Sequence, residues 1–311
     1  MKATYACLTG SPRRIEIRER DLTVGDDQVL LRLAACGMCR YDTHLLEHED
    51  GPAEVFGHEA VGQVIGRGRA VRQFAEGDWV VGGIPAGFAN YSVAREADLC
   101  RVPAELGDLA SLAEPLKCVT TVVRAAAPDC GDTVVVVGCG FMGLAAVAAM
   151  AGNWVGRLIA VDTVPARRQL AKNLGATDTL DPKAGDVNQA IRDLTAGRGA
   201  DVAIEFAGSP EAAMLAAGLL RHRGTLVVAG GFTPRENFYM RAITVHLAPP
   251  MFSADPLDDY RRTVAAMAGG RLPLATLATH RFKLSAVAAA FQSVRSLGPA
   301  YLKGIVVNDL P

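Results

Sequence analysis

The sequence predicts an α/β protein with a mostly β N-terminal part followed by a doubly wound parallel sheet, and three observations support this fold class. Short apolar segments separated by Gly and Pro fill the N-terminal part. A β-branched run, Thr133 to Val137, is apolar on both faces, which is typical of a buried parallel strand. From there strands and helices alternate, as in sheets covered by helices on both faces. At 311 residues, two domains are expected.

The N-terminal part predicts four strands, at apolar segments bounded by turn-forming residues. They cover residues 28–35, 60–65, 79–81 and 90–93. A segment rich in Ala and Leu over 110–127 then predicts a helix. This helix separates the mostly β part from the alternating part.

The alternating part predicts four strands and three helices. The strands cover 133–137, 156–161, 202–206 and 225–229, and the helices cover 144–151, 164–174 and 210–220. The alternation loosens after Gly230-Gly231, and Pro249-Pro250 marks its end. The last segment predicts helices over 256–267 and 285–294 and a strand over 304–307.

Composition and charge exclude several classes of protein. The 32 Lys and Arg residues balance 33 Asp and Glu residues, and the formal net charge is -1. Such a chain lacks the basic surface that binds nucleic acid or an acidic membrane. Neither a membrane-spanning apolar run nor a signal peptide is expected. The seven scattered cysteines do not resemble a secreted disulfide framework, so a cytoplasmic location is expected.

A thiol, an imidazole and carboxylates suggest a metal site. Cys39 is followed by Gly57-His58-Glu59, and Glu114 comes later in the chain. Mixed Cys, His and carboxylate ligands are typical of catalytic zinc sites, whereas structural sites favour Cys and His alone. Taken singly, Cys39 fits a small buried residue and His58 an ordinary histidine. The combination favours zinc.

A glycine-rich motif, Gly138-Cys139-Gly140-Phe141-Met142-Gly143, follows the strand at 133–137 and opens the helix at 144–151. Glycines at this spacing permit a tight turn, close approach of the backbone to a pyrophosphate, and tight packing of helix on strand. The helix N-terminus also attracts phosphate charge. The motif alone is weak evidence, but its position between strand and helix predicts dinucleotide binding.

Asp162 ends the next strand, about 20 residues further on, where dinucleotide-binding proteins place a ribose-binding acid. A carboxylate there accepts hydrogen bonds from ribose hydroxyls and repels a 2′-phosphate, which favours NAD over NADP. Asp162 could instead cap the helix that starts near Pro165. Arg167 is a nearby cation that could meet a phosphate, but covering the adenine face is its expected role.

Together these residues resemble the zinc-dependent medium-chain alcohol dehydrogenases, nearest to the sorbitol and threonine dehydrogenase branch. The resemblance covers essentially the whole chain, and its further segments are Cys39-Arg40-Tyr41-Asp42, Gly57-His58-Glu59-Ala60-Val61-Gly62, Gly77-Asp78-Trp79-Val80, Glu114-Pro115-Leu116 and Leu174-Gly175-Ala176. It implies a GroES-like, mostly β catalytic domain over 1–118 and 249–311. It also implies a Rossmann NAD-binding domain over 119–248, with the active site in the cleft.

The resemblance implies metal-site roles for individual residues. Cys39 and His58 match the catalytic zinc ligands, and Glu59 matches an adjacent glutamate that ligates in some members. Glu114 matches a later glutamate that ligates or holds the zinc-bound water. Asp42 matches an acid that orients the ligand histidine, a role expected because a ligating His usually donates its other N–H group to a carboxylate.

The resemblance also implies the cofactor site. Arg40 lies where some members place a pyrophosphate contact, and the backbone near Phe206 and Gly230 is expected to line the adenosine and nicotinamide sites. The expected NAD contacts are Arg40, Gly138, Gly140, Phe141, Met142, Gly143, Asp162, Arg167, Ala207, Gly208, Gly230 and Gly231.

The chain departs from the family in its metal sites. The four closely spaced cysteines of the structural-zinc lobe are absent, and only a short link joins Val80 to Tyr91. One catalytic zinc ion and no structural zinc are therefore expected. Cys36 is not an expected ligand, whereas Cys118, one helical turn beyond Glu114, is either a ligand or a core residue.

The proton path also departs from the family. Most relatives carry Ser or Thr where this chain has Tyr41, whose phenol can relay a proton but is much bulkier. Tyr41 either transfers the proton or narrows the pocket while His44 or Glu59 handles the proton. His44 matches a histidine that ends the relay in some relatives, and otherwise it is a surface residue.

The expected function is a zinc-dependent oxidoreductase that transfers a hydride between NAD(H) and a small polar secondary alcohol or ketone, such as a polyol, a cyclitol or an amino alcohol. Zinc would act as a Lewis acid on the substrate oxygen. The alternatives are a zinc-independent quinone or enoyl reductase of the same superfamily, and a non-catalytic NAD-binding protein. A homodimer or homotetramer is expected from the relatives.

Overall fold

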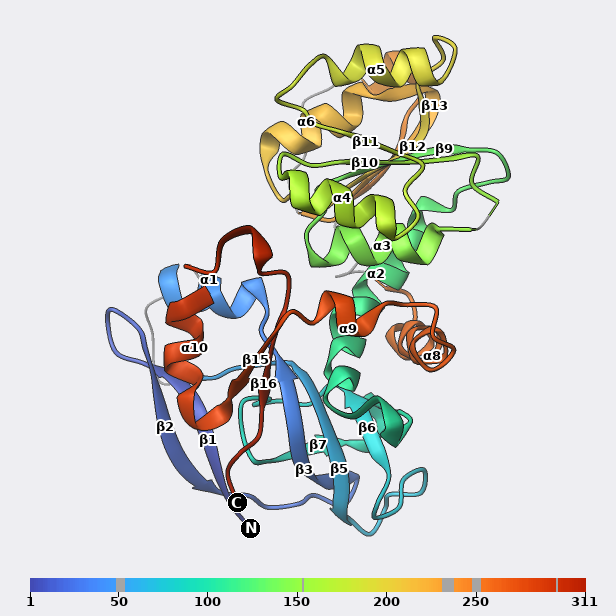
Figure 1. Ribbon diagram of the computed structural model, residues 1–311. Coiled ribbons are helices and arrows are strands. Elements are labelled where there is room, and N and C mark those ends of the chain that lie inside the picture. Colours follow the sequence, from blue (N-terminus) through green and yellow to red (C-terminus); the bar gives the residue numbers. More distant parts are fainter. Residues whose placement is uncertain (49–53, 153, 231–237, 248–252, 295) are drawn as a thin grey trace. The chain divides into compact units, whose positions relative to one another are not determined.

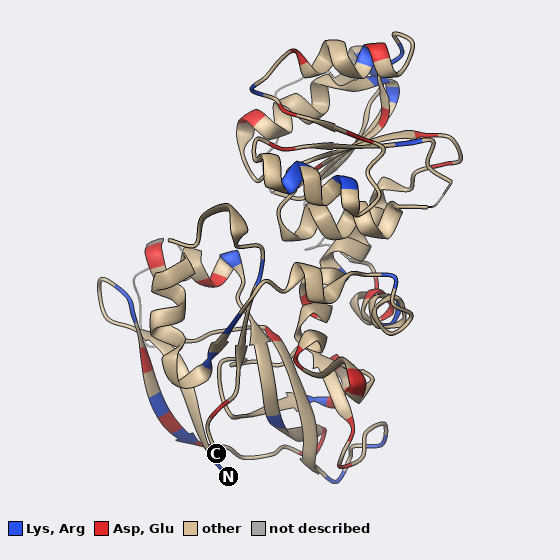
Figure 2. Ribbon diagram, viewed as in Figure 1, with Lys and Arg blue, Asp and Glu red and all other residues tan. Residues whose placement is uncertain are grey.

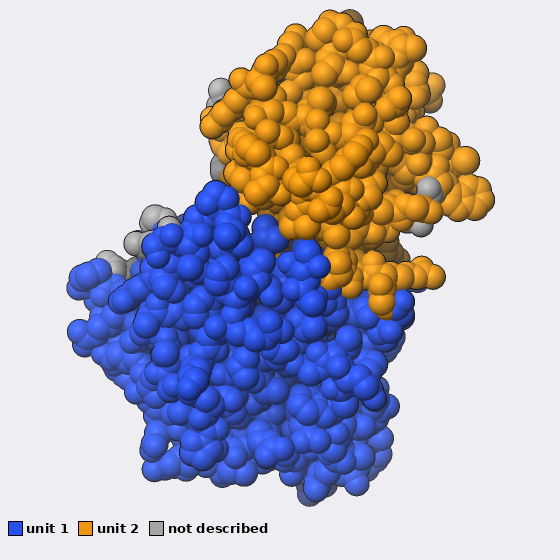
Figure 3. Space-filling model, in the orientation of Figure 1, with its two compact units in different colours: residues 1–115, 260–269, 274–311 blue, residues 116–259, 270–273 orange. Residues whose placement is uncertain are grey.

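The computed structural model describes residues 1–48, 54–152, 154–230, 238–247, 253–294 and 296–311 (Figure 1). They form two compact units (Figure 3). Unit 1 comprises Met1–Pro115, Tyr260–Gly269 and Leu274–Pro311, and unit 2 comprises Leu116–Asp259 and Gly270–Pro273. The expected domain limits, 118/119 and 248/249, remain a prediction, and Pro249-Pro250 lies outside the described residues.

Unit 1 is built on two β-sheets. The smaller sheet has the order β2-β1-β4, from β1 (Lys2–Thr9), β2 (Arg14–Asp21) and β4 (Glu54–Val55). The larger sheet has seven strands in the order β15-β16-β3-β5-β6-β8, with β7 also paired to β3. Its strands are β3 (Gln28–Gly37), β5 (Glu59–Arg67), β6 (Trp79–Gly82), β7 (Tyr91–Arg95), β8 (Leu99–Arg101), β15 (His280–Lys283) and β16 (Gly304–Val307). The expected mostly β part is confirmed.

Both ends of the chain contribute to the larger sheet. Strand β16 pairs antiparallel with β3, which pairs antiparallel with β5 (Figure 1). In this register Gly37 lies opposite both Ile305 and Glu59. The end of β3, the start of β5 and the start of β16 are therefore neighbours, although they lie far apart in the sequence.

The helices of unit 1 cover its sheets and provide a core. They are α1 (Arg40–His48), α9 (Leu274–Leu277) and α10 (Val287–Val294), with a 3₁₀ segment η2 (Ala104–Leu112) and the start of α2 (Ala113–Ala126). The rings of Phe56, Phe88 and Phe291 pack mutually with centroids 4.9–5.6 Å apart. Aromatic groups at such separations add attraction beyond burial of their area.

Edge strand β2 carries charges of both signs, seen as alternating red and blue along it in Figure 2. Arg14 and Arg18 both pair with Glu16, at 2.7 and 2.8 Å. Charged side chains on an edge strand oppose pairing with another chain.

Unit 2 is a parallel sheet in the order β11-β10-β9-β12-β13-β14. The strands are β9 (Thr133–Val137), β10 (Arg157–Val161), β11 (Asp178–Leu180), β12 (Ala200–Glu205), β13 (Leu220–Val228) and β14 (Thr244–Leu247). Its helices are α3 (Phe141–Met150), α4 (Pro165–Asn173), α5 (Val187–Leu194), α6 (Pro210–Gly218) and α7 (Phe238–Arg241). Helices α2 and α8 (Pro256–Ala268) cross the limit between the units. Helices α3 and α4 cover one face and α5 and α6 the other (Figure 1). This is the expected doubly wound arrangement.

Strand β13 begins earlier than expected. The sequence predicts a helix over 210–220 and a strand over 225–229, but the helix ends at Gly218 and the strand starts at Leu220. Leu220 pairs with Ala200 before the register shifts, and Arg223 adopts a left-handed conformation with φ of 59°. The irregular pairing carries polar residues that a pattern of apolar segments does not identify as strand.

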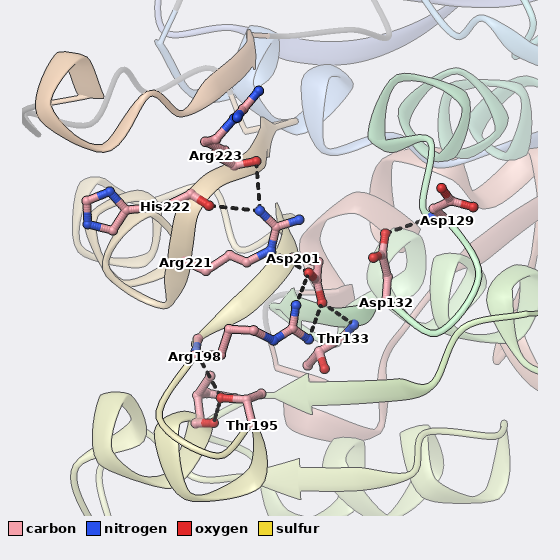
Figure 4. Close-up of polar contacts among 11 residues, drawn as sticks. Asp129, Asp132, Thr133, Thr195, Arg198, Asp201, Arg221, His222 and Arg223 are labelled. Atoms are coloured by element: carbon pink, nitrogen blue, oxygen red, sulfur yellow. Dashed lines mark hydrogen bonds and ion pairs between the residues drawn. The ribbon is translucent and has the colours of Figure 1, made fainter.

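A charged cluster joins three strands of unit 2 where they begin (Figure 4). Asp201, 3% exposed, accepts hydrogen bonds from the Thr133 N–H group at 2.8 Å, from Arg198 at 2.7 and 3.1 Å and from Arg221 at 2.5 Å. Burial alone would raise the pKa of Asp201, but these donors outweigh it and lower the pKa. The carboxylate therefore holds β9, β12 and β13 together.

None of the helices in the described ranges combines the length and apolar character needed to cross a membrane.

Candidate active site

Cys39 lies between the end of β3 and the start of α1, and local hydrogen bonds fix its position. The Asp42 carboxylate accepts a hydrogen bond from the Cys39 N–H group at 3.1 Å. The Tyr41 N–H group donates to the Cys39 sulfur at 3.4 Å. Burial, together with nearby Glu59, raises the pKa of the Cys39 thiol, whereas a bound cation would favour the thiolate.

The pairing of β3 with β5 brings Cys39, His58 and Glu59 together. One ligand atom of each lies within 4.8 Å of the ligand atoms of the other two. The turn into β5 depends on Gly57, whose φ of 86° favours glycine and whose added Cβ atom would lie 2.6 Å from the Phe88 ring. A thiol, an imidazole and a carboxylate in this arrangement fit a catalytic zinc ion.

The buried Glu59 carboxylate forms an ion pair with Lys303. It is 1% exposed, and its Oε1 atom accepts a hydrogen bond from Lys303 Nζ at 2.6 Å. Its Oε2 atom also lies 2.6 Å from Nζ but accepts no hydrogen bond in the described structure. Oε2 is thus paired with a cation but makes no hydrogen bond, and its lone pairs suit it to bind a metal ion as well.

Lys303 was not identified from the sequence, although it determines the charge balance of the site. Its ammonium also donates to the Met38 carbonyl at 2.9 Å, and its side chain is 7% exposed. Burial lowers the pKa of Lys303, but the Glu59 carboxylate, together with Cys39 and Tyr301, outweighs burial and raises it. In the sequence, Lys303 is an ordinary basic residue before a short strand, so no local signal distinguishes it.

Gly37 provides the space for this ion pair. A Cβ atom added at Gly37 would lie 2.0 Å from Glu59 Oε2. Only glycine fits there without displacing the carboxylate.

Asp42 lies near His58 but not at hydrogen-bonding distance, so its role in orienting the histidine remains a prediction. Its Oδ1 atom is 3.6 Å from His58 Nδ1, and this buried oxygen accepts no hydrogen bond in the described structure. The separation still permits electrostatic attraction, and His58 partly offsets the rise in the Asp42 pKa that burial causes.

The other candidate residues are not members of the close group of three ligands. Glu114, in the first turn of α2, is not in the group of three close ligands, but its charge adds to the rise in the Glu59 pKa that burial causes. Tyr41 is 55% exposed, and its ring centroid lies 6.3 Å from that of His58. His44 is exposed on α1, and Cys118 lies further along α2.

A cavity of about 530 Å³ in unit 1 reaches His58 and Glu114. Its other walls come from the link after β6, from β7 and from residues near them, namely Gln28, Gly82, Gly83, Ile84, Pro85, Val93, Ala94, Arg95, Asp98 and Tyr260. A cavity of this size that reaches two candidate ligands has room for a small organic molecule.

The glycine motif of unit 2 forms the expected turn from β9 into α3. Gly138 has a φ of 95°, and a Cβ atom there would lie 2.5 Å from the Ala207 nitrogen. A Cβ atom at Gly143 would lie 1.9 Å from the Gly138 carbonyl oxygen. Around Gly140, at the N-terminus of α3, an added Cβ would meet no atom within 4 Å from the described residues beyond its chain neighbours and its own helix, which leaves room for a ligand beside this backbone.

Asp162 and the arginines after it lie beside this turn. The Asp162 carboxylate accepts hydrogen bonds from the N–H groups of Cys139 at 2.7 Å and Val164 at 2.8 Å. Arg168 donates to the Asp162 carbonyl at 2.7 Å and pairs with Asp181. The Arg167 Nε atom is buried without a hydrogen bond in the described structure.

Glu205 organises two further segments that were expected to contact NAD, and the sequence did not identify it. Its buried carboxylate accepts hydrogen bonds from the N–H groups of Gly208 at 2.5 Å and Gly230 at 3.3 Å. These segments follow β12 and β13 and lie at the edge where the glycine turn follows β9. Gly231 lies outside the described residues. Ligands of doubly wound sheets bind beyond this carboxyl edge.

Two family models match the chain. Residues 25–121 match the alcohol dehydrogenase GroES-like domain, and residues 138–248 match the zinc-binding dehydrogenase domain.

Curated relatives and solved structures give the same result. Sorbitol dehydrogenase from Halalkalibacterium halodurans is 28% identical over 95% of this chain and 96% of its own. L-threonine 3-dehydrogenase from Bacillus subtilis (strain 168) is 29% identical over 86% of this chain and 88% of its own. A structure described as a zinc-binding dehydrogenase from Sinorhizobium meliloti 1021, bound to NADP, is 25% identical with a TM-score of 0.86 over 99% of both chains. The expected family is confirmed: the chain belongs to the zinc-dependent medium-chain alcohol dehydrogenases, a family of oxidoreductases that use a nicotinamide cofactor.

Proposed function

We propose that this protein transfers a hydride between NAD(H) and a small polar secondary alcohol or its ketone. The close approach of Cys39, His58 and Glu59 within 4.8 Å is the observation that carries the proposal. Unit 2 supports it with an open glycine turn at the carboxyl edge of its sheet.

Cys39, His58 and Glu59 are the proposed zinc ligands. The donor set and the Glu59 Oε2 atom without a hydrogen bond support this choice. Glu114, outside the close group but lining the same cavity, is proposed to position the substrate hydroxyl or a water molecule. When bound, zinc supplies a Lewis acid that makes the alkoxide of the substrate accessible near neutral pH.

Lys303 is proposed to balance the charge of the ligand set. Its ammonium donates a hydrogen bond to Glu59 Oε1 and also lies 2.6 Å from Oε2, so it offsets the charge of the whole carboxylate. Without that cation, Glu59 and a Cys39 thiolate would place two negative charges in a buried site, which is costly unless each is compensated.

Tyr41 is proposed to move the substrate proton, with His44 further along α1 as the next group. Its exposed ring beside His58 supports a position at the site. Should Tyr41 only narrow the pocket, Glu59 or His44 would carry the proton. Replacing Tyr41 with Phe separates the two roles, because the ring remains and the hydroxyl is lost.

NAD is the proposed cofactor. The Asp162 carboxylate lies at the end of β10 beside the glycine turn, and each of its oxygens has a lone pair beyond its backbone hydrogen bond for a ribose hydroxyl. Its negative charge would oppose the 2′-phosphate of NADP. The similar structure from Sinorhizobium meliloti holds NADP, and in this chain Arg167 is the local cation that could contact a phosphate.

The contacts proposed for NAD are Arg40, Gly138, Gly140, Phe141, Met142, Gly143, Asp162, Arg167, Ala207, Gly208, Gly230 and Gly231. An Asp162→Ala variant should lose much of its preference for NAD over NADP, measured as the ratio of kcat/KM values. An unchanged ratio would leave Asp162 as a structural residue of the turn.

The proposed substrates are polyols, cyclitols or amino alcohols. The curated relatives support this class, because their names specify sorbitol, threonine and galactonate as substrates. A zinc-independent quinone or enoyl reductase would not need the three close ligands. A non-catalytic NAD-binding protein would need neither the ligands nor the cavity that reaches them.

Deuterium transfer tests the proposal directly. The zinc-loaded protein should move deuterium from the carbinol carbon of a deuterated polyol to C4 of the nicotinamide, as detected by NMR. Reduction of quinones or enoyl compounds, with no alcohol oxidation, would favour the alternative enzyme. NAD binding without any transfer would favour the non-catalytic alternative.

Three further proposals rest on the sequence and the family. The short link between β6 and β7 supports a single catalytic zinc ion without a structural one. A homodimer or homotetramer and a cytoplasmic location also remain proposals. Sedimentation would test the oligomeric state, and fractionation of the source cells would test the location.

A further inference from the structure

The cavity that reaches His58 has a second polar region, called here the polar wall, which Gln28, Arg95 and Asp98 form. His58 and Glu114 line one part of it, and Gln28, Arg95 and Asp98 line another. All five residues belong to unit 1. A molecule bound through its reacting oxygen at His58 would therefore extend toward groups that the site described above does not use.

The short link after β6 leaves this space open. Gly82 and Gly83 contribute no side chain, and a Cβ atom at Gly82 would lie 2.2 Å from the Asp98 carbonyl oxygen. The Gly83 N–H group donates to that same carbonyl at 2.8 Å. The link is thus held against Asp98, and no bulky side chain from its glycines fills the cavity.

The polar wall offers donors and an acceptor but little net charge. Arg95 donates to both Asp98 oxygens, from Nε at 2.8 Å and Nη2 at 3.1 Å. Gln28 accepts a hydrogen bond at Oε1 from the Gly25 N–H group, at 2.8 Å. Within the described residues, Arg95 Nη1 and Gln28 Nε2 donate no hydrogen bond, and each Asp98 oxygen retains a lone pair.

The charge balance distinguishes between kinds of substrate. Arg95 is neutralised by Asp98, and Glu114 adds a further negative charge to the lining. A sugar acid would bring a carboxylate toward two others, whereas a neutral polyol would find donors and acceptors for its hydroxyls. A volume of about 530 Å³ also exceeds what a short diol needs, since cavities of about 300–1,000 Å³ hold drug-sized ligands.

We propose that Arg95, Asp98 and Gln28 are specificity-determining residues that bind the distal hydroxyls of a neutral polyol the size of a hexitol. This rests on the proposed function, because the same cavity must hold the reacting alcohol at His58. The preferred substrate is then a hexitol, ahead of both a short diol and the corresponding sugar acid.

The test compares variants of the full-length, zinc-loaded protein with NAD. The substrates are D-sorbitol, D-gluconate and 2,3-butanediol, and the variants are Arg95→Met and Asp98→Asn. The matched control is Arg69→Met, which removes an Arg–Asp pair of 2.7 Å whose side chains are 84% and 59% exposed and which lies outside the cavity lining.

The expected result is a fall in kcat/KM for sorbitol of about tenfold in Arg95→Met and in Asp98→Asn, mainly through KM, since a hydrogen bond to a charged group is lost. Activity with 2,3-butanediol should stay within about twofold, and the control should match wild type with every substrate. Equal losses for sorbitol and butanediol, or a wild-type preference for gluconate that Arg95→Met abolishes, would overturn the proposal.

A binding measurement separates this proposal from the proposed function. Calorimetric titration of sorbitol into the zinc-loaded protein with NADH should show binding that Arg95→Met weakens about tenfold. If no alcohol is oxidised but this difference is found, the polar wall stands and the hydride-transfer proposal falls. If alcohols are oxidised but wild type and variant bind sorbitol equally well, the proposal for the polar wall is refuted and the hydride-transfer proposal is retained. Sorbitol that neither binds nor reacts also refutes the proposal for the polar wall.

Discussion

Replacing Lys303 with Met tests the buried ion pair on which the site depends. The change removes the cation beside Glu59 and leaves a carboxylate that is 1% exposed without its donor. Because Glu59 and Lys303 are only 1% and 7% exposed at their side chains, water screens the pair little. Breaking such a pair by removing one partner costs about 3–5 kcal/mol, equivalent to a fall of roughly 10 °C in melting temperature.

The size of this loss should depend on pH. Burial raises the folded-state pKa of Glu59, and without Lys303 that rise loses its main opposing interaction. A group whose folded-state pKa is raised loses stability as pH rises from its unfolded value through its folded one. The Lys303→Met variant should therefore be closer to wild type at acidic pH, where Glu59 can be protonated, and further from it above neutral pH.

The assay is urea unfolding of the zinc-free protein, followed by a probe in unit 1, at several pH values. A Glu59→Gln/Lys303→Met double variant should recover a large part of the loss, because no buried charge remains. The control is Lys2→Met, which removes a pair whose side chains are 66% and 59% exposed and should not change stability measurably. A Lys303→Met variant as stable as this control, or a double variant less stable than Lys303→Met, would refute the reasoning.

Three further predictions concern other residues. Asp201→Asn should destabilise unit 2 by about 1–3 kcal/mol near neutral pH, as measured by urea unfolding. Because the pKa of Asp201 is lower in the folded state, this difference should shrink as the pH falls from the unfolded-state pKa through the folded-state pKa. A difference that does not depend on pH would contradict this prediction. Tyr41→Phe should lower kcat about 100-fold if the phenol carries the proton, and an unchanged pH profile with a changed KM would leave Tyr41 as a pocket wall. Gly37→Ala should weaken zinc affinity at least about tenfold, because its Cβ atom would lie 2.0 Å from Glu59 Oε2, and zinc titration showing unaltered affinity would oppose this.

Much of the fold could be predicted because apolar pattern and packing agree along most of the chain. Strand β9 is β-branched throughout and fully buried, so its sequence predicts its position within the sheet. Strand β2 was not predicted because it carries mainly charged residues, and helix α5 was also missed. Strand β13 begins at a polar, irregular pairing that the apolar pattern cannot reveal.

The candidate site was predictable where adjacent residues carry it. Cys39, the pair His58-Glu59 and the glycine motif are local in sequence and specific in type. Lys303 and Glu205 were missed because their roles depend on tertiary contacts. Lysine and glutamate usually lie on the surface. The pairing of β16 with β3 brings Lys303 to Glu59, and the adjacent turns after β12 and β13 surround Glu205.

Zinc content measured together with activity tests the central claim most directly. Elemental analysis of the purified protein should find about one zinc ion per chain. Removing it with a chelator should abolish NAD-linked alcohol oxidation, and added zinc should restore it in wild type but not in His58→Ala. Alcohol oxidation that persists at full rate in the zinc-free protein would contradict the assignment of Cys39, His58 and Glu59 as a catalytic zinc site.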